Sequence, residues 1–420
     1  MTYRDFIHVQ RSSNILGLFA ASFILAGPAM AQQSGHDFPE GAGKSDVVAI
    51  CGGCHDINRL KAGYTVEGWH TVLRMMQNFG APIPQDHLTE ITDYLIKSFP
   101  EGPRPAAKLI EGPIEASIRE WPVATPGSRP HDPLAARDGS IWYTGQLANV
   151  LGRLDPKTGQ IKEYPVKPQT GPHGLKEDKD GNIWFTGNFS SVMGKLDPKT
   201  GKVTEYPMPD AAAKDPHSLV FDHDGILWFT VQQGNKIGRL DPNTGEIKLL
   251  TPPTAGARPY GIVVNSKNVI YVVEFGAPKI AAIDPKTLAI REFPLPDPAA
   301  RPRRLAIGPD DAVWYSDFSR GYLGHLDPAT GQVKEWLSPS GPKSQPYGMV
   351  FTKGAVWYNE SAAKPNTIVR FDPGTEKFQT WAIPGGGDIV RNMDVTADGQ
   401  PVMANSLVNM VGIVEVKGGH

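Results

Sequence analysis

A repeat with a period of 42 to 44 residues constrains the fold of this 420-residue chain more than any other feature. Each unit contains an Ile-Trp-Phe-Thr-like run, a Gly-Arg-Leu-Asp-Pro-like run and a Glu-Tyr-Pro-like run. A period of this length, with four strand-like segments per unit, is typical of a β-propeller blade. One position near the start of the unit recurs seven times and predicts seven blades: His131, His173, His217, Tyr260, Arg303, Tyr347 and Arg391.

The two ends of the repeat array complement each other. The last unit stops after its third strand-like segment, residues 412–416, while residues 117–122 precede the first unit and match the missing fourth segment. We expect residues 117–122 to complete the last blade, because a closed ring leaves no sheet edge open to aggregation. The sequence therefore predicts an all-β seven-bladed propeller over residues 117–416.

A different motif stands ahead of the propeller. Cys51 and Cys54 are the two cysteines of the chain, and His55 completes a Cys-X-X-Cys-His pentapeptide. This spacing is the one by which a c-type haem is attached through two thioether bonds, and the histidine can then bind the iron. A thiol–disulfide redox pair is the alternative, because Cys-X-X-Cys alone also occurs in oxidoreductases.

The segment that follows the motif has helical periodicity. Trp69, Val72, Leu73 and Met76 recur at the spacing of one helix face, and a second helix is expected over residues 88–99. Together with the motif, these helices predict a small all-α domain over residues 37–105, joined to the propeller by a proline-rich linker over residues 106–116. The chain is thus expected to be multidomain.

The start of the chain reads as an export signal. Arg4 and Arg11 precede an apolar run over residues 15–26, and a small-residue cleavage site ends at Ala31. We expect residues 1–31 to be a signal peptide and the mature protein to be periplasmic. No later apolar run reaches the length of about 20 residues that a membrane-spanning helix needs. The balance of 42 basic against 44 acidic residues argues against a nucleic-acid partner.

The recurring position should build a polar site. It lies at the start of the innermost strand of each blade, so the seven side chains are expected to encircle one mouth of the central channel, where propellers commonly bind ligands. Glu274, Asp317 and Glu360 follow three of these positions by 13 or 14 residues and are expected beside the same mouth. A mixed acidic and basic pocket of this kind could bind a metal or a polar small molecule.

The segment over residues 37–105 resembles the class I cytochromes c. The resemblance rests on Cys51, Cys54, His55, Trp69, Val72, Met76, Gly80, Ala81, Pro82, Tyr94 and Leu95. It implies one covalent haem c, with His55 as the proximal iron ligand and Met76 as the distal ligand. Met75 is the alternative distal ligand, and a redox partner protein is expected.

The repeats resemble the virginiamycin B lyase, or streptogramin lyase, family through their Pro-His-Gly, Trp-Phe-Thr, Gly-Arg-Leu-Asp-Pro and Glu-Tyr-Pro segments. The resemblance implies a seven-bladed propeller and, in the true lyases, a magnesium-assisted elimination that opens a cyclic depsipeptide ester. The matching candidate residues are His173, Asp215 and His217. Val231 stands where the family has a glutamate, so the set is incomplete.

Three functions follow from these features. The leading hypothesis is a periplasmic c-type cytochrome that transfers single electrons, with a propeller that binds a partner or a small-molecule substrate. The second is a magnesium-dependent lyase, or a lactonase-like hydrolase, with an accessory haem domain. The third is a non-catalytic propeller that binds a ligand in its channel.

Overall fold

The computed structural model describes residues 37–52, 57–78, 81–102 and 106–417. The predicted signal peptide, Cys54 and His55 lie outside these described residues.

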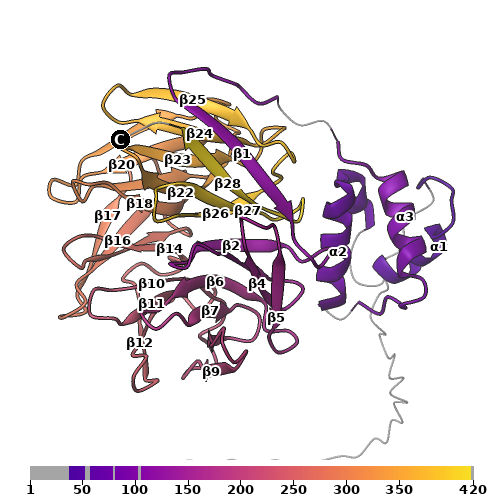
Figure 1. Cartoon of the computed structure of the whole chain (residues 1–420), viewed down its shortest axis with the longest axis horizontal. Coiled ribbons are helices and arrows are strands. Elements are labelled where there is room, and N and C mark those ends of the chain that lie inside the picture. Colours follow the sequence, from indigo (N-terminus) through magenta and orange to yellow (C-terminus); the bar gives the residue numbers. More distant parts are fainter. Residues whose placement is uncertain (1–36, 53–56, 79–80, 103–105, 418–420) are drawn as a thin grey trace, which may run out of the picture.

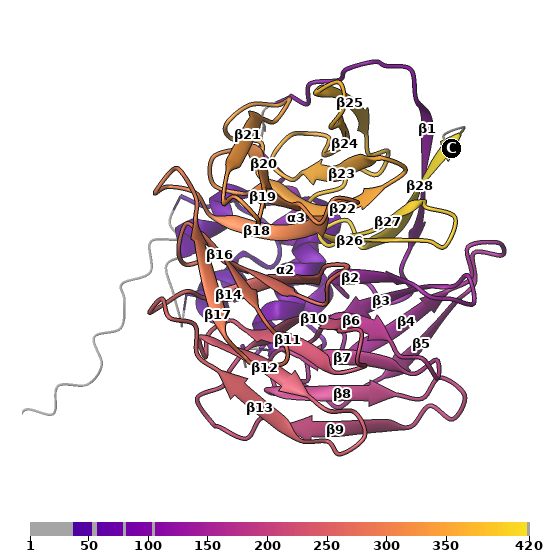
Figure 2. The same ribbon diagram turned by 90° about the vertical axis from the view of Figure 1, so that its left-hand side faces the viewer.

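Seven four-stranded antiparallel sheets surround a central channel (Figure 2). The first three are β2 (Pro130–Ala135), β3 (Ile141–Gly145), β4 (Val150–Leu154) and β5 (Ile161–Pro165); β6 (Pro172–Glu177), β7 (Ile183–Gly187), β8 (Val192–Leu196) and β9 (Val203–Pro207); and β10 (Pro216–Phe221), β11 (Leu227–Val231), β12 (Lys236–Leu240) and β13 (Ile247–Leu250). The next three are β14 (Pro259–Val264), β15 (Ile270–Glu274), β16 (Lys279–Ile283) and β17 (Ile290–Pro294); β18 (Pro302–Ile307), β19 (Val313–Asp317), β20 (Tyr322–Leu326) and β21 (Val333–Leu337); and β22 (Pro346–Thr352), β23 (Ala355–Glu360), β24 (Thr367–Asp372) and β25 (Lys377–Ala382).

The seventh blade joins the two ends of the propeller. Its strands β26 (Val390–Val395), β27 (Pro401–Asn405) and β28 (Met410–Lys417) come from the end of the chain, while β1 (Glu115–Pro122) pairs antiparallel with β28 as the outermost strand (Figure 1). The predicted seven-bladed all-β propeller and its closure by the segment ahead of the first blade are confirmed.

The described residues ahead of the propeller form short helices. These are α1 (Lys44–Asp46), the π-helix η1 (Val47–Cys51), the 3-10 helix η2 (Ile57–Ala62), α2 (Val66–Asn78) and α3 (Leu88–Ser98). Trp69 and Leu73 of α2 pack with Ile91 and Leu95 of α3 in one small apolar cluster. We call this part of the chain the helical unit. None of its helices, and no other described helix, is long and apolar enough to cross a membrane.

The helical unit rests on one face of the propeller through α2 (Figures 1 and 2). The carboxylate of Glu67 accepts a hydrogen bond of 2.6 Å from the backbone N–H of Gly127. The amide of Asn78 donates a hydrogen bond of 3.0 Å to the carbonyl of Leu147, and the hydroxyl of Thr65 donates one of 3.4 Å to Leu407. These partners lie in loops of the first and last blades, so α2 lies against the face where the inner strands begin.

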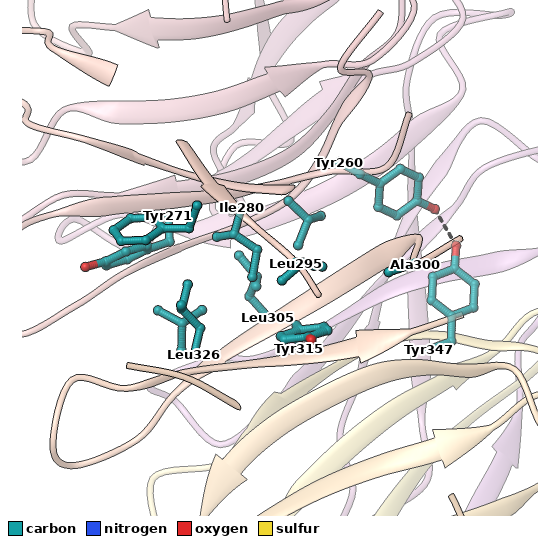
Figure 3. Packing of buried hydrophobic residues seen from close by; sticks show 12 residues of the cluster. Tyr260, Tyr271, Ile280, Leu295, Ala300, Leu305, Tyr315, Leu326 and Tyr347 are labelled. Carbon is teal, nitrogen blue, oxygen red and sulfur yellow. Dashed lines mark hydrogen bonds between the residues drawn. The ribbon is translucent and has the colours of Figure 1, made fainter. Parts of the chain in front are cut away.

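In four of the seven blades, close packing of an aromatic ring explains the recurring glycine of the third strand. Phe229 pairs across the sheet with Gly238, and a Cβ atom on that glycine would lie 2.0 Å from the ring. The same arrangement pairs Tyr315 with Gly324. Between blades, Tyr315 packs into an apolar cluster with residues of the preceding sheet (Figure 3). The Gly-Arg-Leu repeat is therefore a packing signal.

We predict that Gly238→Ala lowers the free energy of unfolding by about 1–3 kcal/mol, because the added methyl group displaces the buried ring of Phe229. Chemical denaturation measures the change. The double variant Gly238→Ala/Phe229→Leu should lose less stability than the sum of the two single variants, since the shorter side chain leaves room for the methyl group. Strictly additive losses would contradict this packing explanation.

Candidate functional site

The candidate site lies in the central channel, where the pairing register is irregular at the beginning of every inner strand. In β10, for example, the pairing register with β11 shifts between Pro216 and Leu219, and the other six inner strands shift at the same place. A bulge sets extra residues against one partner and redirects the side chains. The recurring position and the residue after it lie within this bulge.

Four of the seven recurring side chains form a continuous row of ring contacts, with neighbouring planes tilted by 41° to 49°; we call its three imidazoles the histidine stack. The ring centroids of His131 and His173 are 3.6 Å apart, those of His173 and His217 are 3.7 Å apart, and those of His217 and Tyr260 are 3.9 Å apart. Each of the four side chains belongs to a residue that is at most 3% exposed. The structure therefore brings these four predicted positions into direct contact inside the channel.

The other three positions complete the circle with guanidinium and phenol groups. The hydroxyl groups of Tyr260 and Tyr347 share a hydrogen bond (Figure 3). The guanidinium of Arg303 lies 4.0 Å from the ring centre of Tyr347 and donates a hydrogen bond of 3.4 Å to the Tyr260 hydroxyl. Arg391 donates a hydrogen bond of 2.9 Å to the hydroxyl of Ser406. We call the seven side chains the channel ring.

Arg304 is the functional candidate that sequence reasoning missed. Its guanidinium donates to the carbonyl of Arg391 at 3.0 Å, to the hydroxyl of Ser218 at 2.6 Å and to the carboxylate of Asp132 at 3.1 Å. These partners belong to three other blades, so one buried side chain spans the channel. A cavity of about 210 Å³ borders Arg304 among the inner strands. The available signal was that a second arginine follows Arg303, where three other blades have glycine.

The histidines of the ring are held neutral. Burial lowers the pKa of His173 well below its ordinary value of 6.5, and the neighbouring His131, Arg304 and Arg129 lower it further. Burial likewise lowers the pKa of His217. The Nδ1 atom of His173 has no hydrogen-bond partner among the described residues. The channel thus presents a neutral imidazole with an open nitrogen.

The phenols are shifted in opposite directions. Burial raises the pKa of Tyr260 to about 12. Burial would also raise the pKa of Tyr347, but Arg303, Arg391 and Arg304 outweigh it and lower the value to about 8. Arg303 and Arg304 lower the pKa of both phenols, and the difference comes from Arg391, which acts on Tyr347, and from the shared hydrogen bond, which raises the pKa of Tyr260 and lowers that of Tyr347.

The predicted acidic residues lie in other surroundings. The carboxylate of Glu360 accepts hydrogen bonds from the backbone and hydroxyl of Ser340, and Asp317 pairs with Arg320 at 2.6 Å. Burial and the nearby Glu292 raise the pKa of Glu274 to about 8. Among the described residues, no hydrogen bond or ion pair joins Glu274, Asp317 or Glu360 to the channel ring. Asp317 and Glu360 thus join strands and loops of the blades, whereas the buried carboxylate oxygens of Glu274 have no hydrogen-bond partner among the described residues.

Asp215 is the acidic candidate from the family resemblance. It lies two residues before His217 with a left-handed backbone, φ 69°, and it accepts a hydrogen bond from the amide of Asn188. Burial raises its pKa to about 7. Val231, at the end of the next strand, is fully buried in an apolar cluster. Of the two positions Asp215 and Val231, only Asp215 therefore provides a carboxylate.

Three residues of the ring region could meet around a metal ion. Potential ligand atoms of His131, Asp132 and His173 all lie within 4.8 Å of one another. Magnesium prefers several oxygen ligands, yet Asp132 is the one carboxylate here and already contacts His131, Arg304 and Asn392. Four guanidinium groups nearby would also repel a dication. These side chains do not fit a magnesium site.

The cysteine and the two candidate methionines of the helical unit differ in their relation to its apolar cluster. Cys51 ends η1 and packs partly exposed against the cluster. By its spacing, Met76 lies on the face of α2 that also bears Trp69 and Leu73, both buried. Met75 lies on a neighbouring face. The face with Met76 is opposite the face whose Glu67 contacts the propeller.

Comparisons with known proteins agree with this geometry. The profile of the Virginiamycin B lyase family matches residues 108–371. A solved streptogramin B lyase structure is 28% identical, with a TM-score of 0.66, and the match covers 72% of this chain and 98% of that chain. A virginiamycin B lyase from Staphylococcus aureus is 24% identical, also with a TM-score of 0.66, covering 72% and 99% of the two chains. A catalytically inactive variant of the latter was solved with quinupristin, with a TM-score of 0.65 at 24% identity and coverage of 72% and 99%. No curated protein matches the chain significantly.

The depressed histidine pKa values predict a loss of stability in acid. The unfolded chain binds protons near pH 6.5 that the folded ring does not, so stability is retained above that pH and falls as the pH decreases, by about 1.4 kcal/mol per pH unit for each histidine. Denaturation curves between about pH 7.5 and pH 5.5 measure this slope. His173→Gln should reduce it, whereas the exposed His223→Gln should not. Equal slopes in all three proteins would contradict the assignment.

Proposed function

Because the chain belongs to the virginiamycin B lyase family, we propose that it is a lyase-like enzyme that cleaves the C–O bond of an ester or lactone at the channel ring. The observation that carries the proposal is the imidazole of His173, which is buried, neutral and without a hydrogen-bond partner at Nδ1 among the described residues. A neutral imidazole can accept a proton at physiological pH, as a general base must.

The proposed reaction is an elimination. His173 removes a proton from the carbon next to the carbon that bears the ester oxygen. The C–H electron pair forms a C=C double bond, and the C–O bond breaks with its electron pair remaining on the oxygen of the departing carboxylate. The products are an alkene and a carboxylate in one opened chain, with the proton on the imidazole. The surrounding arginines, which lower the histidine pKa, favour return of that proton to solvent.

The neighbours of His173 orient its ring. His131 and His217 stack on its two sides at 3.6 and 3.7 Å, which limits rotation of the imidazole. Asp132 accepts a hydrogen bond of 2.8 Å from His131 and an ion pair from Arg304, so the stack is anchored to the centre of the channel. Held in this way, the base needs little reorganisation during proton transfer.

Access to the ring depends on the helical unit. The channel-ring histidines are at most 3% exposed, and α2 contacts the loops at the same face of the propeller. A substrate as large as a cyclic depsipeptide can therefore reach the ring through this face only when α2 moves away from it. Hydrolysis by a lactonase-like route would use the same base to activate water.

The assay uses quinupristin, which is bound by the S. aureus lyase variant in its solved complex. We expect a ring-opened product of unchanged mass, as elimination requires, and a loss of about 100-fold or more in kcat/KM for His173→Gln. His223→Gln is the matched control and should keep full activity.

Mass spectrometry separates the two routes, because a product that gains one water indicates hydrolysis. An intact ester after incubation with the wild-type protein, or full activity in His173→Gln, would contradict the lyase proposal.

A second candidate function, single-electron transfer, is favoured by the contact of Cys51 with an apolar cluster and by the place of Met76 on the face of α2 that contributes Trp69 and Leu73 to that cluster. We propose that Cys51 and Cys54 attach a haem c, with His55 and Met76 as iron ligands. The apolar surroundings and the thiol, imidazole and thioether donors suit this group. The haem would supply one-electron chemistry for a redox partner protein. We further propose that the signal peptide directs this protein to the periplasm.

An absorption spectrum of the purified, reduced protein tests the haem proposal. We expect the sharp α-band of a c-type haem in the reduced wild type. In the oxidised protein we expect loss of the methionine-to-iron charge-transfer band in Met76→Ala but not in Met75→Ala. A wild-type protein without the α-band would exclude haem. Loss of the band in Met75→Ala alone would assign the ligand to Met75.

A further inference from the structure

The centre of the propeller contains more positive than negative charge. Arg129, Arg303, Arg304 and Arg391 all lie close enough to lower the pKa of His131. Among the described residues, Asp132 is the one acid that forms a hydrogen bond or ion pair with any of these four guanidinium groups, and it pairs with Arg304. Arg129, Arg303 and Arg391 therefore lack a carboxylate partner in this part of the structure.

Partial burial makes this excess of charge costly, because Arg304 is buried and Arg129, Arg303 and Arg391 are only partly exposed. A charged group that leaves water without a counter-charge loses several kcal/mol of hydration free energy. The aromatic rings around Arg303 return part of that energy, since its guanidinium lies 4.0 Å from the Tyr347 ring centre and 4.1 Å from that of Phe318. Aromatic rings do not neutralise the charge, so the arrangement favours an anion in the channel.

The geometry around Arg303 is suited to a flat anion. The rings of Tyr347 and Phe318 fix the guanidinium, and its buried Nε has no hydrogen-bond partner among the described residues. Ser406 holds Arg391 at 2.9 Å. Open donors and fixed guanidinium groups are the features of a prepared anion site.

We propose that Arg129, Arg303 and Arg391, with the hydroxyl of Tyr347, form a binding site for a carboxylate. A carboxylate is planar and can accept two parallel hydrogen bonds from a guanidinium, and the guanidinium of Arg303, packed against the Tyr347 and Phe318 rings, has an unpartnered Nε among the described residues. The inference rests on the proposed lyase function to the extent that the carboxylate would be the leaving group of the cleaved ester. In this proposal, arginines stabilise the negative charge of the leaving carboxylate, a role that a magnesium ion held by acidic residues would otherwise fill.

The experiment measures binding of acetate to the full-length protein by isothermal titration calorimetry at constant ionic strength. We expect saturable binding to the wild type and a dissociation constant at least about tenfold higher for Arg303→Gln, because a charge-assisted hydrogen bond is lost. Arg119→Gln removes an arginine that pairs with Glu415 on the seventh blade, and it should bind acetate like the wild type. Chloride in place of acetate should give no saturable heat.

Several outcomes would overturn the proposal. These are no saturable acetate binding to the wild type, unchanged binding in Arg303→Gln, or tighter binding of inorganic phosphate than of acetate. If Arg303→Gln fails to fold, Arg391→Gln provides the same comparison. Acetate binding without ester cleavage would contradict the lyase function alone, and ester cleavage without acetate binding would contradict the carboxylate site alone.

Discussion

The buried guanidinium of Arg304 is the interaction on which the centre of this propeller depends. A guanidinium has five N–H donors, and leaving them unsatisfied inside a protein is costly. Arg304 meets this requirement by reaching Asp132, Ser218 and the backbone of Arg391 on three other blades. The carboxylate of Asp132 in turn contacts His131. One side chain thus links the ion pair of the channel to the histidine stack.

Helix α2 separates the proposed haem ligand from the proposed catalytic base. The face of α2 with Glu67 contacts the propeller, whereas the face with Met76 lies on the opposite side of the helix. An α-helix with its side chains is about 10–12 Å wide. The proposed haem ligand and the proposed catalytic base are therefore on opposite sides of α2, and the same helix restricts entry to the channel. Movement of one helix could affect both functions.

The sequence predicted the propeller well because a blade is a local unit. Strand periodicity, turn residues and the aromatic–glycine pairs all lie within 42 to 44 residues, and the missing fourth strand identified the closing segment. The channel ring followed from the same repeat. Glu274, Asp317 and Glu360 were expected beside that ring, but Asp317 and Glu360 contact strands and loops of the blades, and the buried carboxylate of Glu274 has no hydrogen-bond partner among the described residues. Sequence spacing places a residue along a strand, but the direction of its side chain depends on the local twist and neighbouring loops.

The sequence by itself determined the number of blades, the closure of the ring and the identity of the seven side chains at the start of the inner strands. Only the tertiary structure decided that His131, His173 and His217 stack, that Arg304 crosses the channel and that α2 lies over its mouth. The physical reason is that these contacts join residues from different blades, as with Arg304 and Asp132, 172 positions apart. The charge and the burial of a side chain in the channel depend on residues that the different blades place around it.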